Sequence, residues 1–213
     1  SSLSVRPRLI VLENVAGLVF SHKPLLHEIV RLLAGLWYTV RVWILNAMWS
    51  GIPQSRPRVW IIGLLTASMV EATPLVPMDI GFLPSLSQGF VDIVGAAGEE
   101  CSLTKRQRGL LTKAQRDINK LKGWEFEKQA ILIDLAAGES FLQWQVDRCP
   151  TLTRSRAMKG GFYVLQRKSF LELSEMASLM GIPEEYVKAF QATGLKDSVI
   201  AGAMGNAQSI NSL

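Results

Sequence analysis

The segment of residues 49–63, with the sequence WSGIPQSRPRVWIIG, constrains the fold of this 213-residue chain more than any other. Its first glycine permits a sharp bend and its two prolines stiffen the backbone, so we expect a rigid polar turn. Residues 59–62 are β-branched or aromatic throughout, which predicts a buried strand. The turn therefore holds Arg56 and Arg58 at the start of a strand. We expect one arginine to stabilise the local structure and Arg58 to reach into a cleft.

Hydrophobic patterning on both sides of this turn predicts an α/β arrangement. Leu9–Leu12 is a short apolar run, typical of a parallel strand covered on both faces. Pro24–Leu36 has the apolar period of a helix. Tyr38–Leu45 and Arg58–Leu65 are further strands, close enough in sequence to pair antiparallel. Together they predict half of a doubly wound sheet, with Glu13 at the carboxyl end of a strand, where such sheets bind ligands.

Residues 66–147 differ in character, because prolines and glycines first interrupt any regular period and a basic, helical stretch then follows. Between residues 103 and 123, seven cations stand against one anion, so this stretch accounts for the whole net charge of +5. The cations are Lys105, Arg106, Arg108, Lys113, Arg116, Lys120 and Lys122. They form either a solvated helix face or a surface that contacts phosphates.

The last third of the chain returns to regular patterning. Phe162–Leu165 is predicted to be a strand, and helices are expected at 169–179 and 184–193, before a closing GNAQSIN segment. Thr153, Gly160 and Gly161 precede the strand. They could contact a phosphodiester, or the two glycines could simply form a turn.

Composition and cysteine content exclude several classes of protein. With 48% hydrophobic and 19% charged residues, the chain can bury a core, and no apolar run reaches the roughly 18 residues that span a bilayer. The two cysteines, Cys101 and Cys149, have neither metal-ligand spacing nor a disulfide framework. No membrane partner, metal site or export signal is therefore expected, and the protein is expected to be intracellular.

Four motifs, in order, resemble those of the DNA cytosine-5 methyltransferases. LENVAG at residues 12–17 resembles the family's Glu-Asn-Val motif, and residues 51–58 resemble its GxPQxRxR motif. SEMASLMGIP at 174–183 and GNAQSIN at 205–211 resemble its late helix and closing motif. The resemblance implies an α/β fold: the C-terminal half of a Rossmann-like, S-adenosylmethionine-dependent methyltransferase sheet, plus a small target recognition region. It divides the chain into catalytic core (1–65), target recognition region (66–147) and returning core with closing helices (148–213).

The same resemblance implies roles for individual residues. Glu13 and Arg58 match the residues that act on the cytosine ring, and the partner is DNA, with a flipped cytosine as substrate. The closing motif implies that the S-adenosylmethionine cofactor lies near Gly205, Asn206 and Ala207. Residues expected to contact nucleic acid are Arg56, Lys105, Arg106, Arg108, Lys113, Thr153, Gly160 and Gly161.

The sequence also departs from the family pattern. The family's Pro-Cys nucleophile motif and glycine-containing cofactor loop should precede residue 12, and neither is present. Cys101 and Cys149 lie in the wrong places to be the nucleophile. We therefore expect a fragment that is inactive alone and that needs the remaining N-terminal part of the catalytic domain. Alternatives are a tRNA methyltransferase of the same fold and a non-catalytic DNA-binding remnant. DNA as substrate predicts the nucleus in a eukaryote or the cytoplasm in a bacterium.

Overall fold

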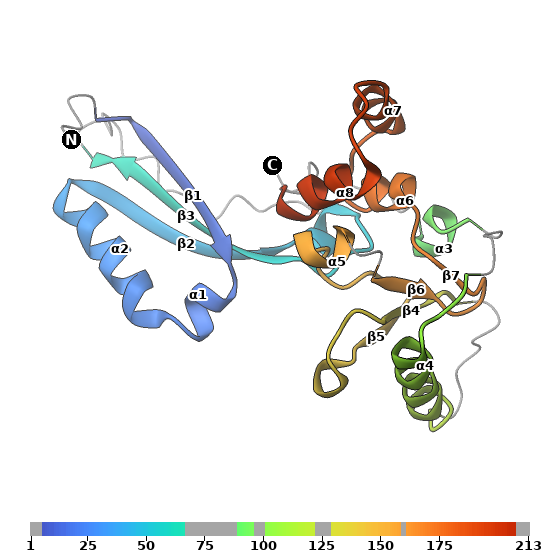
Figure 1. Cartoon of the computed structure of the whole chain (residues 1–213). Coiled ribbons are helices and arrows are strands. Elements are labelled where there is room, and N and C mark those ends of the chain that lie inside the picture. Colours follow the sequence, from blue (N-terminus) through green and yellow to red (C-terminus); the bar gives the residue numbers. More distant parts are fainter. Residues whose placement is uncertain (1–5, 67–88, 96–100, 122–128, 159–160, 208–213) are drawn as a thin grey trace. The chain divides into compact units, whose positions relative to one another are not determined.

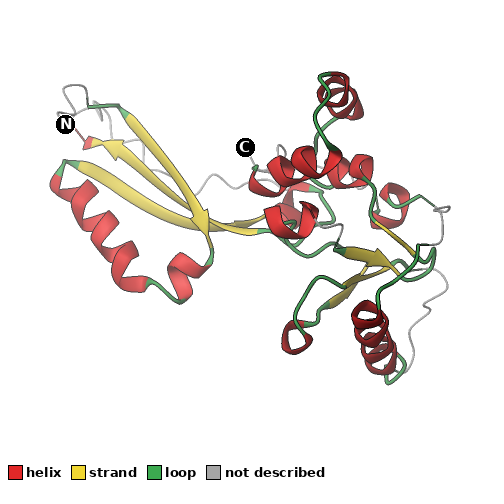
Figure 2. Cartoon of the chain, viewed as in Figure 1, coloured by secondary structure: helices red, strands yellow, loops and turns green. Residues whose placement is uncertain are grey.

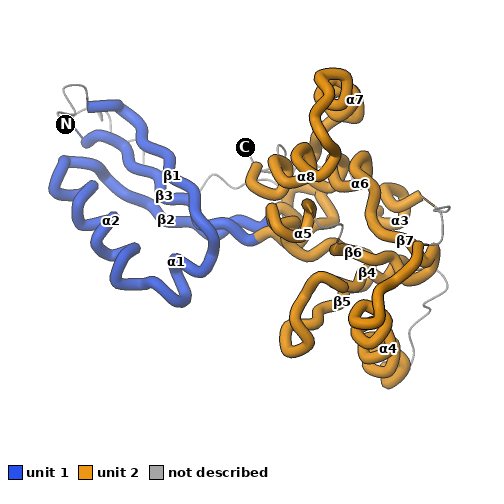
Figure 3. Tube along the Cα trace, in the orientation of Figure 1, with its two compact units in different colours: residues 1–46, 57–83 blue, residues 47–56, 84–213 orange. Residues whose placement is uncertain are grey.

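The computed structural model describes residues 6–66, 89–95, 101–121, 129–158 and 161–207, and the chain forms two compact units (Figures 1 and 3). Unit 1 comprises residues 1–46 and 57–83, and unit 2 comprises residues 47–56 and 84–213. The rigid turn is thus split between the units, because residues 47–56 pack within unit 2 while the strand after them belongs to unit 1. Gly160 and the residues after Ala207 lie outside the described residues.

Unit 1 is a three-stranded antiparallel sheet covered on one face by two helices. Its elements are β1 (Leu9–Val15), α1 (Gly17–Phe20), α2 (Lys23–Gly35), β2 (Tyr38–Asn46) and β3 (Pro57–Leu65). The strand order is β1-β3-β2, and β3 runs antiparallel to both neighbours. Helix α2 has proline in its first turn, where no N–H is required, and it packs Leu26 and Leu33 onto Val59 and Ile61 of β3.

The antiparallel pairing of residues 38–45 with 58–65 is confirmed, as is the helix at 24–36. The first strand was expected to be parallel and covered on both faces, and both expectations are wrong, because β1 runs antiparallel to β3 and is partly exposed. Within the described part of the chain β1 pairs only with β3, and its residues Leu9, Val11 and Val15 are each about half exposed. The unbroken apolar run could not reveal this, since it reports which side chains favour burial and not which neighbours are present.

Unit 2 is built on a second antiparallel sheet with the order β5-β4-β6-β7. Its strands are β4 (Ile131–Asp134), β5 (Trp144–Val146), β6 (Phe162–Val164) and β7 (Ser169–Phe170). Its α-helices are α3 (Phe90–Ile93), α4 (Lys105–Ile118), α5 (Arg154–Met158), α6 (Leu173–Ser178), α7 (Glu184–Ala192) and α8 (Asp197–Asn206). The described residues of unit 2 also include the 3-10 turns η1 (Ala47–Ser50) and η4 (Glu139–Phe141), and Figure 2 distinguishes the helices from the strands by colour.

The sheet of unit 2 is buried on both faces. Ile131 and Ile133 of β4 pack against the apolar stripe of α4, whereas Leu132 packs against the core formed with α5, α6 and α8. The side chains of a strand alternate between the two faces of the sheet. All four residues of β4 are buried, so the strand contributes side chains to the core on each face. None of the helices described here is long and apolar enough to cross a membrane.

Two predicted elements at the C-terminus need correction. The helix expected at 169–179 is instead the short strand β7 followed by α6, which begins only at Leu173. The Glu175 carboxylate accepts the Glu172 N–H at 2.7 Å, and this cap fixes the start of the helix. The residues Gly205 and Asn206, expected in a closing segment after the last helix, form the last residues of α8.

Candidate functional site

The polar turn is anchored inside unit 2 by two buried side chains. The Gln54 amide nitrogen donates to the Leu179 carbonyl at 3.1 Å. The Arg56 guanidinium, with only 3% of the residue exposed, donates to the carbonyls of Leu152 at 2.7 Å and Ala207 at 2.6 Å. Backbone bonds from Ser55 and to Pro53 tie the turn to Cys149 as well. Arg56 is therefore the arginine that stabilises the local structure. Its guanidinium is buried, so in this structure it is not presented to a phosphate.

The other arginine, Arg58, forms an ion pair with Glu13 within unit 1. Its Nε lies 2.8 Å from Glu13 Oε1, and the side chains are only 12% and 24% exposed, respectively. Burial lowers the pKa of Arg58 below its ordinary value, while the charge of Glu13 opposes that shift. The two residues predicted to act on the cytosine ring are thus brought together on neighbouring strands.

Strand register explains why this pair forms. Glu13 lies opposite Trp60, and Arg58 lies opposite Val15, so all four side chains are on the same face of the sheet. That face is opposite the one covered by α2, whose partners on β3 are Val59 and Ile61. The Glu13–Arg58 pair therefore lies on the face of unit 1 opposite its own helices, where both side chains are largely shielded from solvent.

In the closing motif, the end of α8 packs closely against the segment before α5. A Cβ atom on Gly205 would lie 2.5 Å from the Arg154 nitrogen and 2.5 Å from the Thr153 carbonyl carbon. The Gly205 and Ala207 carbonyls accept hydrogen bonds from Arg56. The exposed Asn206 side chain is the one of the three predicted cofactor contacts that faces solvent.

Replacing Gly205 by alanine is expected to lower the free energy of unfolding by about 1–3 kcal/mol, because backbone atoms cannot move aside as a flexible side chain can. Gly109→Ala in α4 is the matched control, since a Cβ there meets nothing within 4 Å. It should stabilise the chain by about 0.5–1 kcal/mol. Urea denaturation followed by circular dichroism measures both. Equal stability of the two variants would show that the close approach at Gly205 does not affect the free energy of unfolding.

The segment before β6 is tightly packed at Gly161. A Cβ atom there would lie 2.7 Å from the Ala136 Cβ, and both backbone polar groups of Gly161 are hydrogen-bonded, to Leu135 and Arg156. These contacts agree with the second of the two predictions for Gly161, a turn and not a contact with phosphate. Thr153, in contrast, is exposed, and its hydroxyl lies 3.5 Å from that of Ser155, so it remains able to donate to a phosphate.

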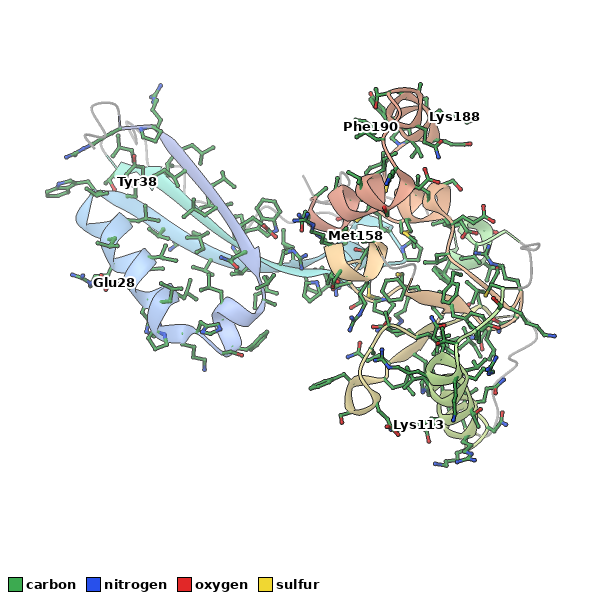
Figure 4. All side chains as sticks on the ribbon, viewed as in Figure 1. Glu28, Tyr38, Lys113, Met158, Lys188 and Phe190 are labelled. Carbon is green, nitrogen blue, oxygen red and sulfur yellow. The ribbon has the colours of Figure 1, made fainter. Side chains whose placement is uncertain are left out.

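The basic helix α4 forms as predicted, with Leu110, Ala114 and Ile118 on its buried side. Its first residues are held by a capping box between Thr104 and Gln107. Three of the four predicted contacts also make local bonds while remaining exposed: Arg106 to the Ala137 carbonyl, Arg108 to that of Leu103, and Lys113, labelled in Figure 4, to that of Glu139. Lys105 and Arg116 are also exposed. The helix therefore presents positive charge to solvent.

Neither cysteine has the environment of a nucleophile. Cys149 is completely buried, and this desolvation, together with the charge of Asp134, raises the pKa of its thiol far above the ordinary range. Cys101 is partly exposed, and its thiol donates to the Lys168 carbonyl. Both environments agree with the sequence argument that the nucleophile is not among these two residues.

The thiols are therefore expected to differ sharply in reactivity. In the native chain at neutral pH, a thiol-reactive disulfide reagent should modify Cys101 rapidly and leave Cys149 intact, whereas both should react in denaturant. Mass spectrometry of digested samples measures the modification of each residue. Rapid native labelling of Cys149 would contradict its placement in the core.

Sequence reasoning missed the ion pairs that hold unit 2 together. Arg167 and Glu175 form an almost fully buried pair, and Arg156 lies 2.7 Å from Asp134. These partners are separated by 8 and 22 residues, and no short-range pattern marks them. The glutamate of the late helix motif is thereby explained as a local structural residue.

Comparisons with known proteins agree with the four motifs. A family model described as C-5 cytosine-specific DNA methylase matches residues 3–212. Type II methyltransferase M.AplI of Arthrospira platensis is 34% identical over 62 residues, which are 29% of this chain and 18% of that protein. Type II methyltransferase M.BanI of Aneurinibacillus aneurinilyticus is 43% identical over 61 residues, 28% of this chain and 14% of that protein.

Solved structures show the same fold. Entamoeba histolytica methyltransferase EhMeth superposes with a TM-score of 0.57 at 17% identity, covering 97% of this chain and 60% of its own. S. pombe Dnmt2 methyltransferase superposes with a TM-score of 0.61 at 15% identity, covering 96% and 64%. This chain thus matches less than two thirds of each of these structures and less than a fifth of each curated relative.

Proposed function

The chain belongs to the C-5 cytosine-specific DNA methylase family, and on that premise we propose that it is the C-terminal portion of an enzyme that methylates carbon 5 of a flipped cytosine in DNA. The observation that carries the proposal is the largely buried ion pair between Glu13 and Arg58, on the face of unit 1 opposite its helices. A carboxyl group and a guanidinium at this spacing can contact a ring nitrogen and an adjacent carbonyl oxygen of one base. The predicted active residues are therefore a geometrically matched pair.

The chemistry explains why such a pair is needed. Cytosine carbon 5 is a poor nucleophile, and addition of a thiolate to carbon 6 activates it by covalent catalysis. Negative charge then develops on ring nitrogen 3 and the carbonyl oxygen. Glu13 hydrogen-bonds the ring nitrogen and Arg58 stabilises the oxygen, in a site that the base enters after leaving the helix. Before the base arrives, each side chain serves as the other's partner.

S-adenosylmethionine is the proposed methyl donor, and its sulfonium methyl group would supply the electrophile. The residues described here could contact only a small part of this cofactor. Gly205 is explained by packing and the carbonyls of Gly205 and Ala207 are used by Arg56, so Asn206 alone retains a side chain free to contact a cofactor. Most of the cofactor contacts are therefore assigned to protein outside these 213 residues.

The thiolate must also come from elsewhere, since Cys149 is buried and no Pro-Cys pair occurs in the sequence. We accordingly propose the remaining N-terminal part of the catalytic domain as partner and expect no activity from this chain alone. The exposed apolar residues of β1 support this arrangement, because an open strand edge is a ready pairing surface. A DNA substrate would place the protein in the nucleus of a eukaryote or the cytoplasm of a bacterium.

DNA is favoured over tRNA by the description of the family model. The tRNA alternative is retained because the exposed cations of α4 would suit either polyanion. A non-catalytic DNA-binding remnant is the third candidate. The Glu13–Arg58 pair argues against it, since a remnant has no need of two complementary charged groups held together on this face of the sheet.

One assay separates the three candidates. Transfer of labelled methyl groups to DNA and to tRNA is measured for the complete protein that contains this chain, and for the 213-residue chain alone. Transfer to DNA by the complete protein, with none by the chain alone, is the expected result. Transfer to tRNA alone would favour the RNA enzyme, and DNA binding without any transfer would leave the remnant.

A further inference from the structure

Trp60 lies in the central strand of the unit 1 sheet, directly opposite Glu13. The register of β1 and β3 pairs Glu13 with Trp60, and on the other side of β3 the register pairs Trp60 with Trp43 of β2. Opposite residues of an antiparallel pair point to the same face, with Cβ atoms about 4.5–5.5 Å apart. Arg58 is on that face too, because it precedes Trp60 by two residues of the same strand. The Trp60 side chain is therefore next to both members of the Glu13–Arg58 pair.

The Trp60 side chain is buried, and its polar group has no partner. Only 9% of the residue is exposed, and its indole nitrogen Nε1 is buried without a hydrogen-bond partner among the described residues. Most buried donors have a partner, because an unsatisfied N–H group costs free energy. An indole N–H can only donate, so the partner that would satisfy it is an acceptor. A phenylalanine would fill this position without that cost, and the indole N–H therefore needs an explanation of its own.

The carboxyl group of Glu13 is such an acceptor. Glu13 Oε1 lies 2.8 Å from Arg58 Nε, yet it is buried and has no hydrogen bond with a described residue, so the contact with Arg58 is an ion pair alone. In the proposed reaction Arg58 turns to the carbonyl oxygen of the base, while Glu13 uses one carboxyl oxygen at the ring nitrogen. The other carboxyl oxygen of Glu13 then needs a new donor.

We propose that Trp60 is a positioning residue of this site, whose indole N–H donates to the second carboxyl oxygen of Glu13 when Arg58 engages the base. The bond fixes the orientation of the carboxyl group towards ring nitrogen 3. Trp60 acts through Glu13 and is assigned no contact with the substrate. The inference rests on the proposed function, because it deepens the role of Glu13 in that reaction.

The first test compares Trp60→Phe with Trp43→Phe in the complete protein that contains this chain. Both changes remove one indole N–H and keep an aromatic ring, but Trp43 is on β2, which does not adjoin the strand of Glu13. Single-turnover methyl transfer at saturating nucleic acid should fall about tenfold or more in Trp60→Phe, as expected for loss of one hydrogen bond at the reacting centre. The dissociation constant of the nucleic acid should stay within about twofold. Trp43→Phe should leave both quantities within about twofold.

The second test does not depend on activity. In the complete protein with isotope-labelled tryptophan, the indole N–H resonance of Trp60 is assigned by its loss in Trp60→Phe and is followed by NMR. Arg58→Met removes the competing partner of Glu13, so the Trp60 indole proton should move downfield as it gains a bond to the carboxylate. Adding Glu13→Leu to Arg58→Met removes the acceptor, and the shift should disappear. This double variant replaces the ion pair with apolar side chains, a change that folded proteins often tolerate.

The outcomes separate the positioning role from the function on which it rests. Undiminished transfer by Trp60→Phe, in a protein that methylates DNA or tRNA, would overturn the positioning role and leave the proposed function intact. A fall in nucleic-acid affinity as large as the fall in rate would also overturn it, because Trp60 would then serve binding or folding. The same result follows if the indole resonance is identical in Arg58→Met and in the double variant. A complete protein that methylates neither nucleic acid would sink the proposed function, and the positioning role with it.

Discussion

Replacing Arg56 by methionine is expected to lower the free energy of unfolding by about 3–5 kcal/mol. Methionine retains much of the apolar volume but removes every donor. The Leu152 and Ala207 carbonyls, which accept from Arg56 at 2.7 and 2.6 Å, would lose these bonds in the interior of unit 2. Charge-assisted bonds of this kind contribute more than neutral ones, and about 3–5 kcal/mol is a large share of the stability of an ordinary domain.

The control for this prediction is Arg154→Met, on an exposed arginine of α5 in the same unit. It should change the free energy of unfolding by no more than about 0.5 kcal/mol. Urea denaturation gives the overall comparison, and hydrogen exchange of peptides that cover α8 localises the effect. If both variants unfold at the same urea concentration, the buried guanidinium does not hold the turn to α8.

The second large effect is expected on activity, where Glu13→Gln should lower methyl transfer by the complete protein about 10²- to 10⁴-fold. Glutamine has the same shape as glutamate but cannot exchange a proton at the ring nitrogen or carry the negative charge that pairs with Arg58. Single-turnover transfer of labelled methyl groups at saturating DNA measures the chemical step. The fold should survive, because glutamine keeps the size of the side chain and its amide oxygen can still accept a hydrogen bond from Arg58.

Glu28→Gln provides the matched control for this activity measurement. Glu28 is a carboxylate of the same unit that is also paired with an arginine, Arg31, but it lies exposed on α2 (Figure 4). Its replacement should leave the rate within about twofold. Equal rates for wild type and Glu13→Gln, with equal DNA affinity, would remove Glu13 from the chemistry and favour the DNA-binding remnant.

Arg56 and Arg58 therefore have different expected phenotypes although they are two residues apart. The sequence indicated that both arginines are held in fixed positions, because a proline-stiffened turn before an apolar strand has little backbone freedom. It could not assign their roles from spacing alone. The structure separates them by packing: Arg56 belongs to unit 2 and bonds to carbonyls, and Arg58 belongs to unit 1 and bonds to Glu13.

The role of the closing motif was likewise only partly predictable from the sequence. Its resemblance to the family's closing motif implied a cofactor contact at Gly205, Asn206 and Ala207, and that role stays a proposal for Asn206. What the glycine does in the fold was not visible, because the obstacle to a Cβ comes from Thr153 and Arg154, some 50 residues away in the chain. α8 was missed for a related reason: its glycine and alanine content gives a weak amphipathic signal, since most of the helix is buried by its neighbours.

The sequence by itself determined several of the local elements and the family of this protein. The apolar period of a helix found α2, and a run of β-branched and aromatic residues found β3, because both patterns follow from local backbone geometry and side-chain shape. Only the tertiary structure decided that β1 pairs with β3 alone among the described strands, that Arg56 is buried, and that Arg58 pairs with Glu13. Those facts depend on contacts between residues far apart in the chain, and long-range contacts are set by packing that no local pattern encodes.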